Sequence, residues 1–205
     1  MDKAVYLLFI LLLFSCKDKT QDNYTKEEKC NGYYANKYAK FFNEWSVNRE
    51  DKKVIDSTLY YLDKKINCDV KNTNNIQEKA NFLIYNGFYD EAIIEIDSIS
   101  NTEPFFKMMK GALALRLGRN NSENLLKEAH NGFTQNIQKH HDPNDVFSKI
   151  MLDNYFEGKE YALKHSAKAK KNFNEEYQIT NIEAVEQMIK EISKKEVLYH
   201  VFKIK

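Results

Sequence analysis

Helix-breaking residues are scarce in this sequence. Only six glycines and two prolines occur among its 205 residues. Long stretches without them favour α-helices, because these two residues weaken a helix interior most. Charged residues make up 30% of the chain, yet the formal net charge is only +1 at pH 7. Such a balanced chain lacks the basic surface on which nucleic-acid binding depends, so we expect no nucleic-acid partner.

Sequence motifs of common catalytic and cofactor sites are also missing. The chain contains no phosphate-binding glycine loop, nucleophile elbow, H-E-x-x-H zinc motif, calcium loop or C-x-x-C pair. We therefore expect no enzyme activity, no cofactor and no metal. The alternative is a pair of carboxylates brought together from distant positions, as in glycoside hydrolysis.

The histidines do not change this expectation. In the run at residues 140–142, His-His-Asp, neighbouring side chains point in different directions, and Asp142 suits a helix N-cap before Pro143. We interpret the run as a solvated loop. The remaining histidines are expected to be isolated, at structural or surface positions: His130, His165 and His200.

The first 15 residues have the pattern of an export signal. Lys3 precedes an unbroken apolar run from Ala4 to Phe14. This run is shorter than the roughly 20 residues that cross a bilayer, so it fits the apolar centre of a secretory signal. Residues 17–24 are polar and indicate a short flexible tether.

The expected cleavage site reads Leu13-Phe14-Ser15-Cys16. It resembles the lipobox of bacterial lipoproteins, with an apolar residue three before the cysteine and a small residue directly before it. The resemblance implies that residues 1–15 are removed, that Cys16 is acylated and that the acyl chains hold the protein on a membrane. It also implies the cell envelope, at the outer membrane, with the periplasmic and surface faces both open. An ordinary signal peptide and an uncut signal anchor are the alternatives.

Two cysteines remain once the acylated one is set aside. An even number of thiols in an oxidising compartment favours a disulfide. If residues 26–46 and 50–67 form an antiparallel hairpin that turns near Asn48, Cys30 and Cys68 both lie about 30 Å from the turn, at the same end. We predict that they are bonded, with two unrelated buried thiols as the alternative.

Local signals place several helix starts. Thr25-x-x-Glu28 and Thr180-x-x-Glu183 are capping-box patterns, which predict the starts of the first and last helices. The only strand-like pattern runs from Val197 to Ile204, within a short C-terminal tail at residues 197–205.

Residues 73–106 have small and large side chains at regular positions. These are Ile76, Ala80, Leu83, Gly87, Tyr89, Ala92 and Pro104. At these positions the segment resembles a tetratricopeptide (TPR) repeat, an antiparallel helix pair of about 34 residues. The alanines allow close helix approach, and the glycine ends the first helix.

Neighbouring segments follow the same plan less closely. Residues 109–129 and 146–162 have similar glycine breaks, and residues 26–69 form a hairpin of similar size. The expected fold is all-α: antiparallel helix pairs, roughly eight helices, stacked over residues 25–196 as a short TPR-like α-solenoid with a closing C-terminal helix.

In TPR-like arrays the first helix of each pair lines a concave groove that receives a peptide or a helix. The resemblance implies that Asn81 and Tyr85, and by a looser match Arg116 and Tyr155, face such a groove. An asparagine suits a peptide backbone, an arginine a carboxylate, and a tyrosine offers contact area. Ordinary packing and surface roles are the alternatives.

These features favour a membrane-anchored lipoprotein that acts as a non-catalytic protein-binding scaffold in an envelope assembly. A second hypothesis is an immunity-type inhibitor of a toxin, because small exported lipoproteins also have that role. A third is glycan capture, by analogy with the much longer SusD-like lipoproteins that embed such repeats. The expected partner is a protein or peptide.

Replacement of Cys16 by alanine tests the anchor. Without the thiol no thioether forms, so the Cys16→Ala chain is expected to stay uncleaved or to leave the membrane fraction. Membrane fractionation and intact-mass measurement, with the native chain as reference, check both outcomes. A processed Cys16→Ala chain that stays on the membrane would refute the lipobox interpretation.

Overall fold

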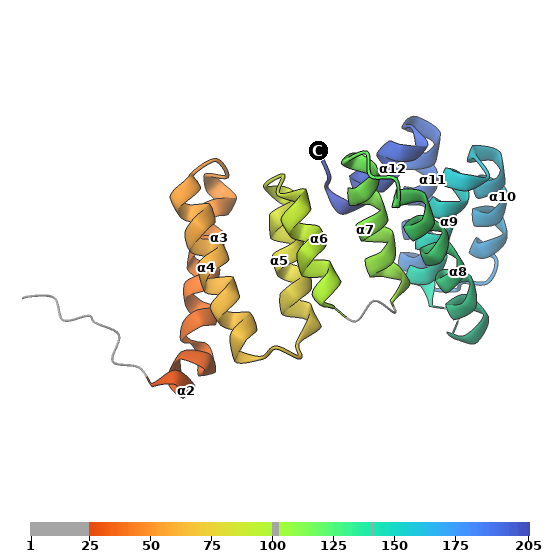
Figure 1. Ribbon diagram of the computed structural model, residues 1–205. Helices are drawn as coiled ribbons and strands as arrows, with labels where there is room; N and C mark the ends of the chain where they lie inside the picture. The colour runs from red at the N-terminus through yellow and green to blue at the C-terminus, as the bar shows by residue number, and fades with distance from the viewer. Residues whose placement is uncertain (1–24, 100–102, 141) are drawn as a thin grey trace, which may run out of the picture. The chain divides into compact units, whose positions relative to one another are not determined.

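The computed structural model describes residues 25–99, 103–140 and 142–205. The expected signal sequence, Cys16 and the tether lie outside these residues. The described chain is all-helical, and ten helices, α3 to α12, pack in sequential antiparallel pairs (Figure 1). The predicted all-α class and the antiparallel pairing are therefore confirmed, with ten helices in place of the roughly eight expected. They belong to two compact units, which divide between Cys68 and Asp69.

The first unit is a helical hairpin. Its elements are α2 (Lys26–Glu28), the π-helical turn η1 (Lys29–Tyr33), α3 (Tyr34–Val47) and α4 (Lys52–Cys68). The predicted capping box is present, because the Glu28 amide donates to Thr25 Oγ1 (3.2 Å) and the Thr25 amide donates to Glu28 Oε2 (2.7 Å). Cys30 and Cys68 form the predicted disulfide, with their Cα atoms 5.4 Å apart.

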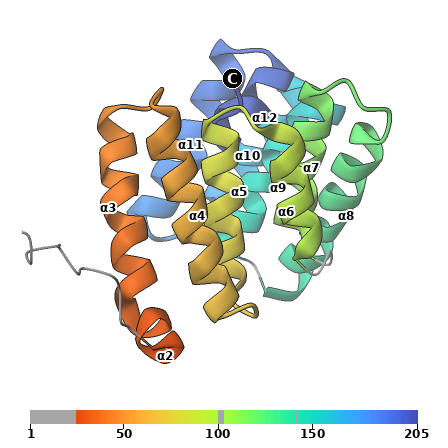
Figure 2. The ribbon, with the colours of Figure 1, turned by 60° about the vertical axis from the view of Figure 1, so that its left-hand side comes forward.

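The second unit contains the other helices. They are α5 (Thr73–Tyr85), α6 (Tyr89–Ser98), α7 (Pro104–Arg116), α8 (Ser122–His140), α9 (Pro143–Phe156), α10 (Lys159–Lys170), α11 (Glu176–Glu191) and α12 (Lys194–Phe202). Figure 2 shows α5 beside α6, and the pairs α7–α8 and α9–α10 pack in the same way. The last helix, α12, turns back and packs against α7, α9 and α11.

Small residues set the spacing within these pairs. Ala80 and Ala92 are fully buried in the α5–α6 pair, as expected for a close helix crossing. Between them the chain reverses at Gly87, whose φ of +81° suits glycine best. In the next pair, a Cβ atom on Gly111 of α7 would lie 2.8 Å from the Leu126 side chain of α8. The helices approach so closely that only glycine fits there.

Two predictions about the C-terminal part are wrong. Thr180 does not start a helix, because α11 already begins at Glu176 and Thr180 Oγ1 donates to the Glu176 carbonyl (2.9 Å). Most of the expected strand-like tail is instead helical and belongs to α12 (Lys194–Phe202). Its start is a capping box that the sequence reading missed: the Glu196 amide donates to Ser193 Oγ (3.3 Å), and the Ser193 amide donates to Glu196 Oε2 (2.9 Å).

Removal of the disulfide is expected to destabilise the first unit. The bond joins residues 38 positions apart, and closure of such a loop contributes about 3 to 4 kcal/mol in the chain-entropy model. A Cys30→Ser/Cys68→Ser double variant should therefore unfold at a lower urea concentration. Fluorescence of Trp45, the single tryptophan, reports on this unit because the residue is buried within it.

Native protein treated with a reductant serves as the control and should unfold at the same urea concentration as the double variant. Equal midpoints for the oxidised native protein and the double variant would contradict a stabilising role for the bond.

Candidate functional site

The predicted groove residues lie beside the C-terminal segment, defined here as residues 194–205. Asn81 and Tyr85 of α5 line a small hollow of about 200 Å³, and Phe202 and Lys203 line it from the C-terminal segment. One side of the expected groove is therefore covered by the chain itself.

Arg116 and Tyr155 contact the same segment. Arg116 Nε donates to the backbone oxygen of Lys205, and its guanidinium lies 6.0 Å from the ring centre of Tyr199. Lys194 Nζ donates to the Tyr155 carbonyl oxygen (3.0 Å) and lies 5.2 Å from that tyrosine's ring centre. The C-terminal segment thus occupies the place that the TPR resemblance gives to a ligand.

A larger hollow of about 560 Å³, named here the inner hollow, adjoins the small one, and both are lined by Phe105 and Val201. Side chains of α5, α7, α8, α9, α11 and α12 line it. Its apolar lining consists of Phe105, Phe133, Phe147, Met151, Ala184, Val185 and Val201. Its polar lining consists of Gln77, Asn144, Asp145, Ser148 and Asn181. None of these residues was predicted as a site residue, because they come together only when α11 and α12 are placed.

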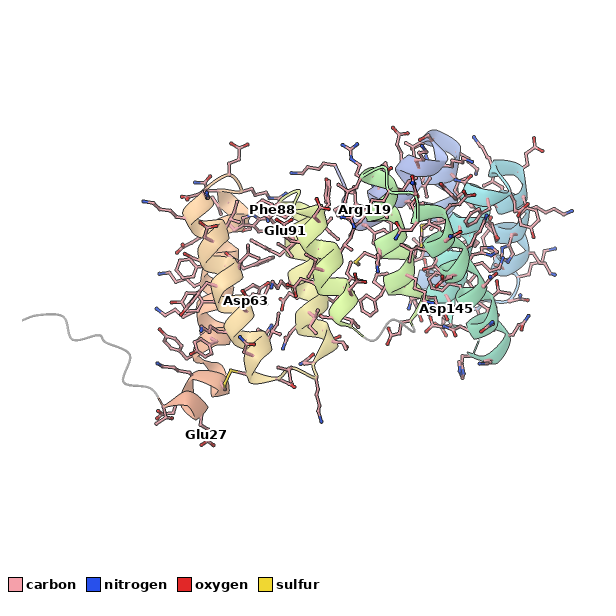
Figure 3. All side chains as sticks on the ribbon, viewed as in Figure 1. Glu27, Asp63, Phe88, Glu91, Arg119 and Asp145 are labelled. Atoms are coloured by element: carbon pink, nitrogen blue, oxygen red, sulfur yellow. A yellow bond between two sulfur atoms is a disulfide. The ribbon has the colours of Figure 1, made fainter. Side chains whose placement is uncertain are left out.

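Asp145 is the only charged side chain among the residues that line the inner hollow. It lies in the first turn of α9, near the label in Figure 3. Partial burial raises the pKa of the Asp145 carboxyl, and the nearby Asp142 adds to this rise. A hydrogen bond from Asn136 and the proximity of His140 oppose it without cancelling it. The inner hollow therefore combines apolar surface with one partly buried negative charge.

A second polar group lies deeper in the same unit. Asp153 of α9 is only 1% exposed. Its Oδ1 atom accepts a hydrogen bond from His130 Nε2 of α8 (2.7 Å), and its Oδ2 atom accepts one from His165 Nδ1 of α10. Lys149 Nζ, one turn earlier on α9, donates to both oxygens, at 2.8 and 3.0 Å. The expectation that His130 and His165 are isolated is therefore wrong.

The electrostatics of this cluster follow from its donors. Burial alone would raise the pKa of Asp153, but the hydrogen bonds from His130, His165 and Lys149 hold it well below its ordinary value. An ionised carboxylate only accepts hydrogen bonds, so both imidazoles donate to it through the nitrogens named above. The sequence shows only the Lys149–Asp153 spacing of one helical turn, whereas the histidines reach Asp153 through helix packing.

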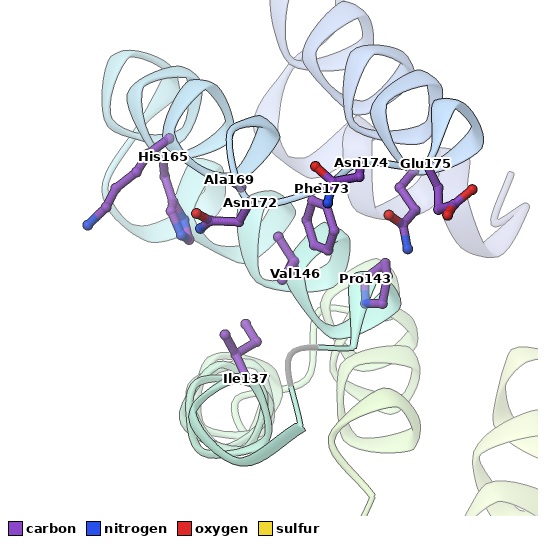
Figure 4. A pocket seen from close by; sticks show the side chains of 11 residues that line it. Ile137, Pro143, Val146, His165, Ala169, Asn172, Phe173, Asn174 and Glu175 are labelled. Carbon is purple, nitrogen blue, oxygen red and sulfur yellow. The ribbon is translucent and has the colours of Figure 1, made fainter.

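A third feature is a hollow of about 470 Å³ next to His165 (Figure 4). Its lining comes from α8, α9, α10, the turn that follows α10 and the start of α11. Ile137, Val146 and Phe173 contribute apolar surface, and Asn172 lies beside His165. Because Nδ1 of His165 donates to Asp153, its Nε2 atom lies on the side of the ring away from that carboxylate.

In the described part of the chain, no cluster of three or more His, Cys, Asp and Glu side chains has the arrangement of a metal site. No helix among the described residues has both the length and the apolar character needed to cross a membrane. No protein-family model matches this chain, and comparisons with curated proteins and with solved structures give no match.

Replacement of Asp153 by asparagine is expected to lower the free energy of unfolding by about 3 kcal/mol, because Lys149 is left partly buried without its counter-charge. Urea unfolding at pH 7, followed by circular dichroism, measures the loss. Asp69→Asn is the matched control, since Asp69 is exposed in the same unit. A loss no larger than that of the control would contradict a stabilising network.

The effect of Asp153 is also expected to depend on pH. Its pKa is lowered in the folded state, so its contribution is fully present above the unfolded-state pKa of about 3.9 and is lost as the pH falls through the folded-state value. The difference in unfolding free energy between the native protein and Asp153→Asn should therefore shrink between pH 7 and pH values of about 3. A difference that is unchanged over this range would refute the assignment.

Proposed function

We propose that this chain is a non-catalytic protein-binding scaffold of the cell envelope, and that its inner hollow binds an exposed segment of a partner protein. The observation that carries the proposal is the lining of the inner hollow, in which apolar side chains are combined with a few polar ones. Concave sites of several hundred Å³ with this mixture are typical of binding sites in proteins.

The proposal includes an anchor. Cleavage before Cys16 and acylation of its thiol would hold the mature chain at the outer membrane, as the lipobox resemblance implies. Residues 17–24 would then be the tether between the membrane and the helical units. A scaffold held in this way meets its partner at a high local concentration, which favours binding by modest contacts.

The proposal also includes a short TPR-like solenoid. It is supported by the buried Ala80 and Ala92 in one pair and by the close approach at Gly111 in the next. In such arrays the first helix of each pair lines the concave surface. In this chain α5, α7, α9 and α11 have that position in their pairs, and all of them contribute to the inner hollow.

We assign a structural role to the C-terminal segment. Its buried side chains are Val197, Leu198, Phe202 and Ile204. Burial of this much apolar surface holds the segment in place, so it forms a wall of the binding site. The partner would then contact the inner hollow, while Arg116 and Tyr155 hold the wall.

The Asp153 cluster supports a non-catalytic interpretation of the unit. Both carboxylate oxygens already accept hydrogen bonds, and the donors come from α8, α9 and α10. A carboxylate in this state links helices together and has little capacity to take a proton from a substrate.

The proposal is tested by filling the inner hollow. Ala184 is exposed on α11 and lines the inner hollow, so Ala184→Trp is expected to block binding without disturbing the core. Ala167→Trp, at an exposed alanine of α10, is the matched control. The native chain and each variant are used in turn to capture partners from membranes. Quantitative mass spectrometry then shows which captured protein is lost with each variant.

We expect the native chain and Ala167→Trp to capture one partner in stoichiometric amount. Ala184→Trp should fail to capture it. Capture of no stoichiometric partner, or equal capture by all three chains, would refute a scaffold that binds through the inner hollow. A toxin as the captured partner would assign the inhibitor role in place of the assembly role.

A further inference from the structure

The carboxylate of Asp145 has few neighbouring groups that stabilise its negative charge. Among the ion pairs of the described residues none includes Asp145, and the groups that act on it are Asn136, Asp142 and His140. The amide of Asn136 is neutral, and Asp142 repels it. Asp145 therefore forms no ion pair within the described part of the chain, and His140 is the only basic group there that acts on its charge.

The start of α9 offsets only part of this deficit. Asp145 lies in the first helical turn, where the unpaired backbone amides contribute a partial positive charge of about half an elementary charge. Its pKa is raised nevertheless, because burial against the inner hollow outweighs the favourable groups. A cation brought into the inner hollow would therefore be attracted by a partly buried carboxylate.

We propose that the segment bound in the inner hollow carries a lysine or arginine that pairs with Asp145, next to an apolar side chain that enters the apolar lining. This inference rests on the proposed function and specifies its partner. Asp145 is the only charged residue of the lining, so charge complementarity selects a basic segment over an acidic one.

The polar lining suggests how the rest of the segment is held. Asn144 and Asn181 are exposed at the inner hollow, on α9 and α11, and Gln77 is half-buried on α5. Side-chain amides have both a donor and an acceptor, which suits the N–H and C=O groups of a peptide backbone. The expected ligand is therefore a peptide segment bound through its backbone, one apolar side chain and one basic side chain.

The test starts from a library of short random peptides displayed on phage and selected on the full chain, purified in detergent with its disulfide intact. Peptides that are retained by the native chain and by Ala167→Trp, but not by Ala184→Trp, bind in the inner hollow. These peptides are synthesised, and their Kd values are measured by isothermal titration calorimetry.

The expected result is that these peptides share a lysine or arginine close to an apolar residue. Asp145→Asn should weaken their binding by about tenfold, the size of effect typical of a lost charged hydrogen bond. Asp69→Asn, the exposed control, should leave Kd unchanged. A charge exchange gives a second test: Asp145→Lys should reject the basic peptide and accept a version in which its basic residue is replaced by glutamate.

The two proposals fail in different ways. Peptides that bind in the inner hollow without a common basic residue, or with equal Kd for native chain and Asp145→Asn, would overturn the inferred partner chemistry and leave the scaffold proposal standing. Failure to select any peptide that Ala184→Trp excludes would refute both. Matching circular dichroism spectra of native and variant chains show that the effects do not come from unfolding.

Discussion

The carboxylate of Asp153 is a negative charge removed from water, and its donors come from three successive helices. His130 of α8 and His165 of α10 approach it from either side, and Lys149 approaches from its own helix. These hydrogen bonds fix the rotation of α9 about its axis, because any other rotation would leave the charge buried without partners. Each residue advances an α-helix by about 100°, so Ser148 lies far around α9 from Asp153 and lines the inner hollow.

The C-terminal segment supplies the second constraint on the inner hollow. It packs on α7 and α9, where it meets the residues that a TPR-like array would offer to a ligand. Phe105 of α7 contacts the ring of Phe202, with the ring centres 5.7 Å apart, and lines both hollows. The C-terminal segment therefore covers part of the surface of α7 and α9, the first helices of their pairs, and leaves the rest of that surface open. The shape of the proposed site depends on this partial coverage as much as on the helix pairs.

The sequence predicts the features of this chain that depend on neighbouring residues. The glycine break at Gly87 and the cap at Asp142 place helix ends correctly, because local backbone conformation decides them. The pattern at Thr180 misleads, since the same residue types occur inside a helix that has already started. The Asp153 cluster and the inner hollow could not be predicted. Their residues are far apart in the sequence, and no local pattern fixes how α10, α11 and α12 pack on α9.

Two aspartates of α9 differ in how well the surrounding groups stabilise their negative charges. This difference distinguishes a structural charge from one available for recognition. Asp153 is more deeply buried, yet its pKa is lowered, because three side chains donate hydrogen bonds to it. Asp145 is only partly buried, yet its pKa is raised, because the hydrogen bond from Asn136, the proximity of His140 and the helix start do not compensate for the lost water. A further cation could gain little at Asp153, where both oxygens are occupied. At Asp145 it would neutralise a charge that the fold leaves only partly stabilised, and this difference supports the proposed preference of the inner hollow for a basic partner.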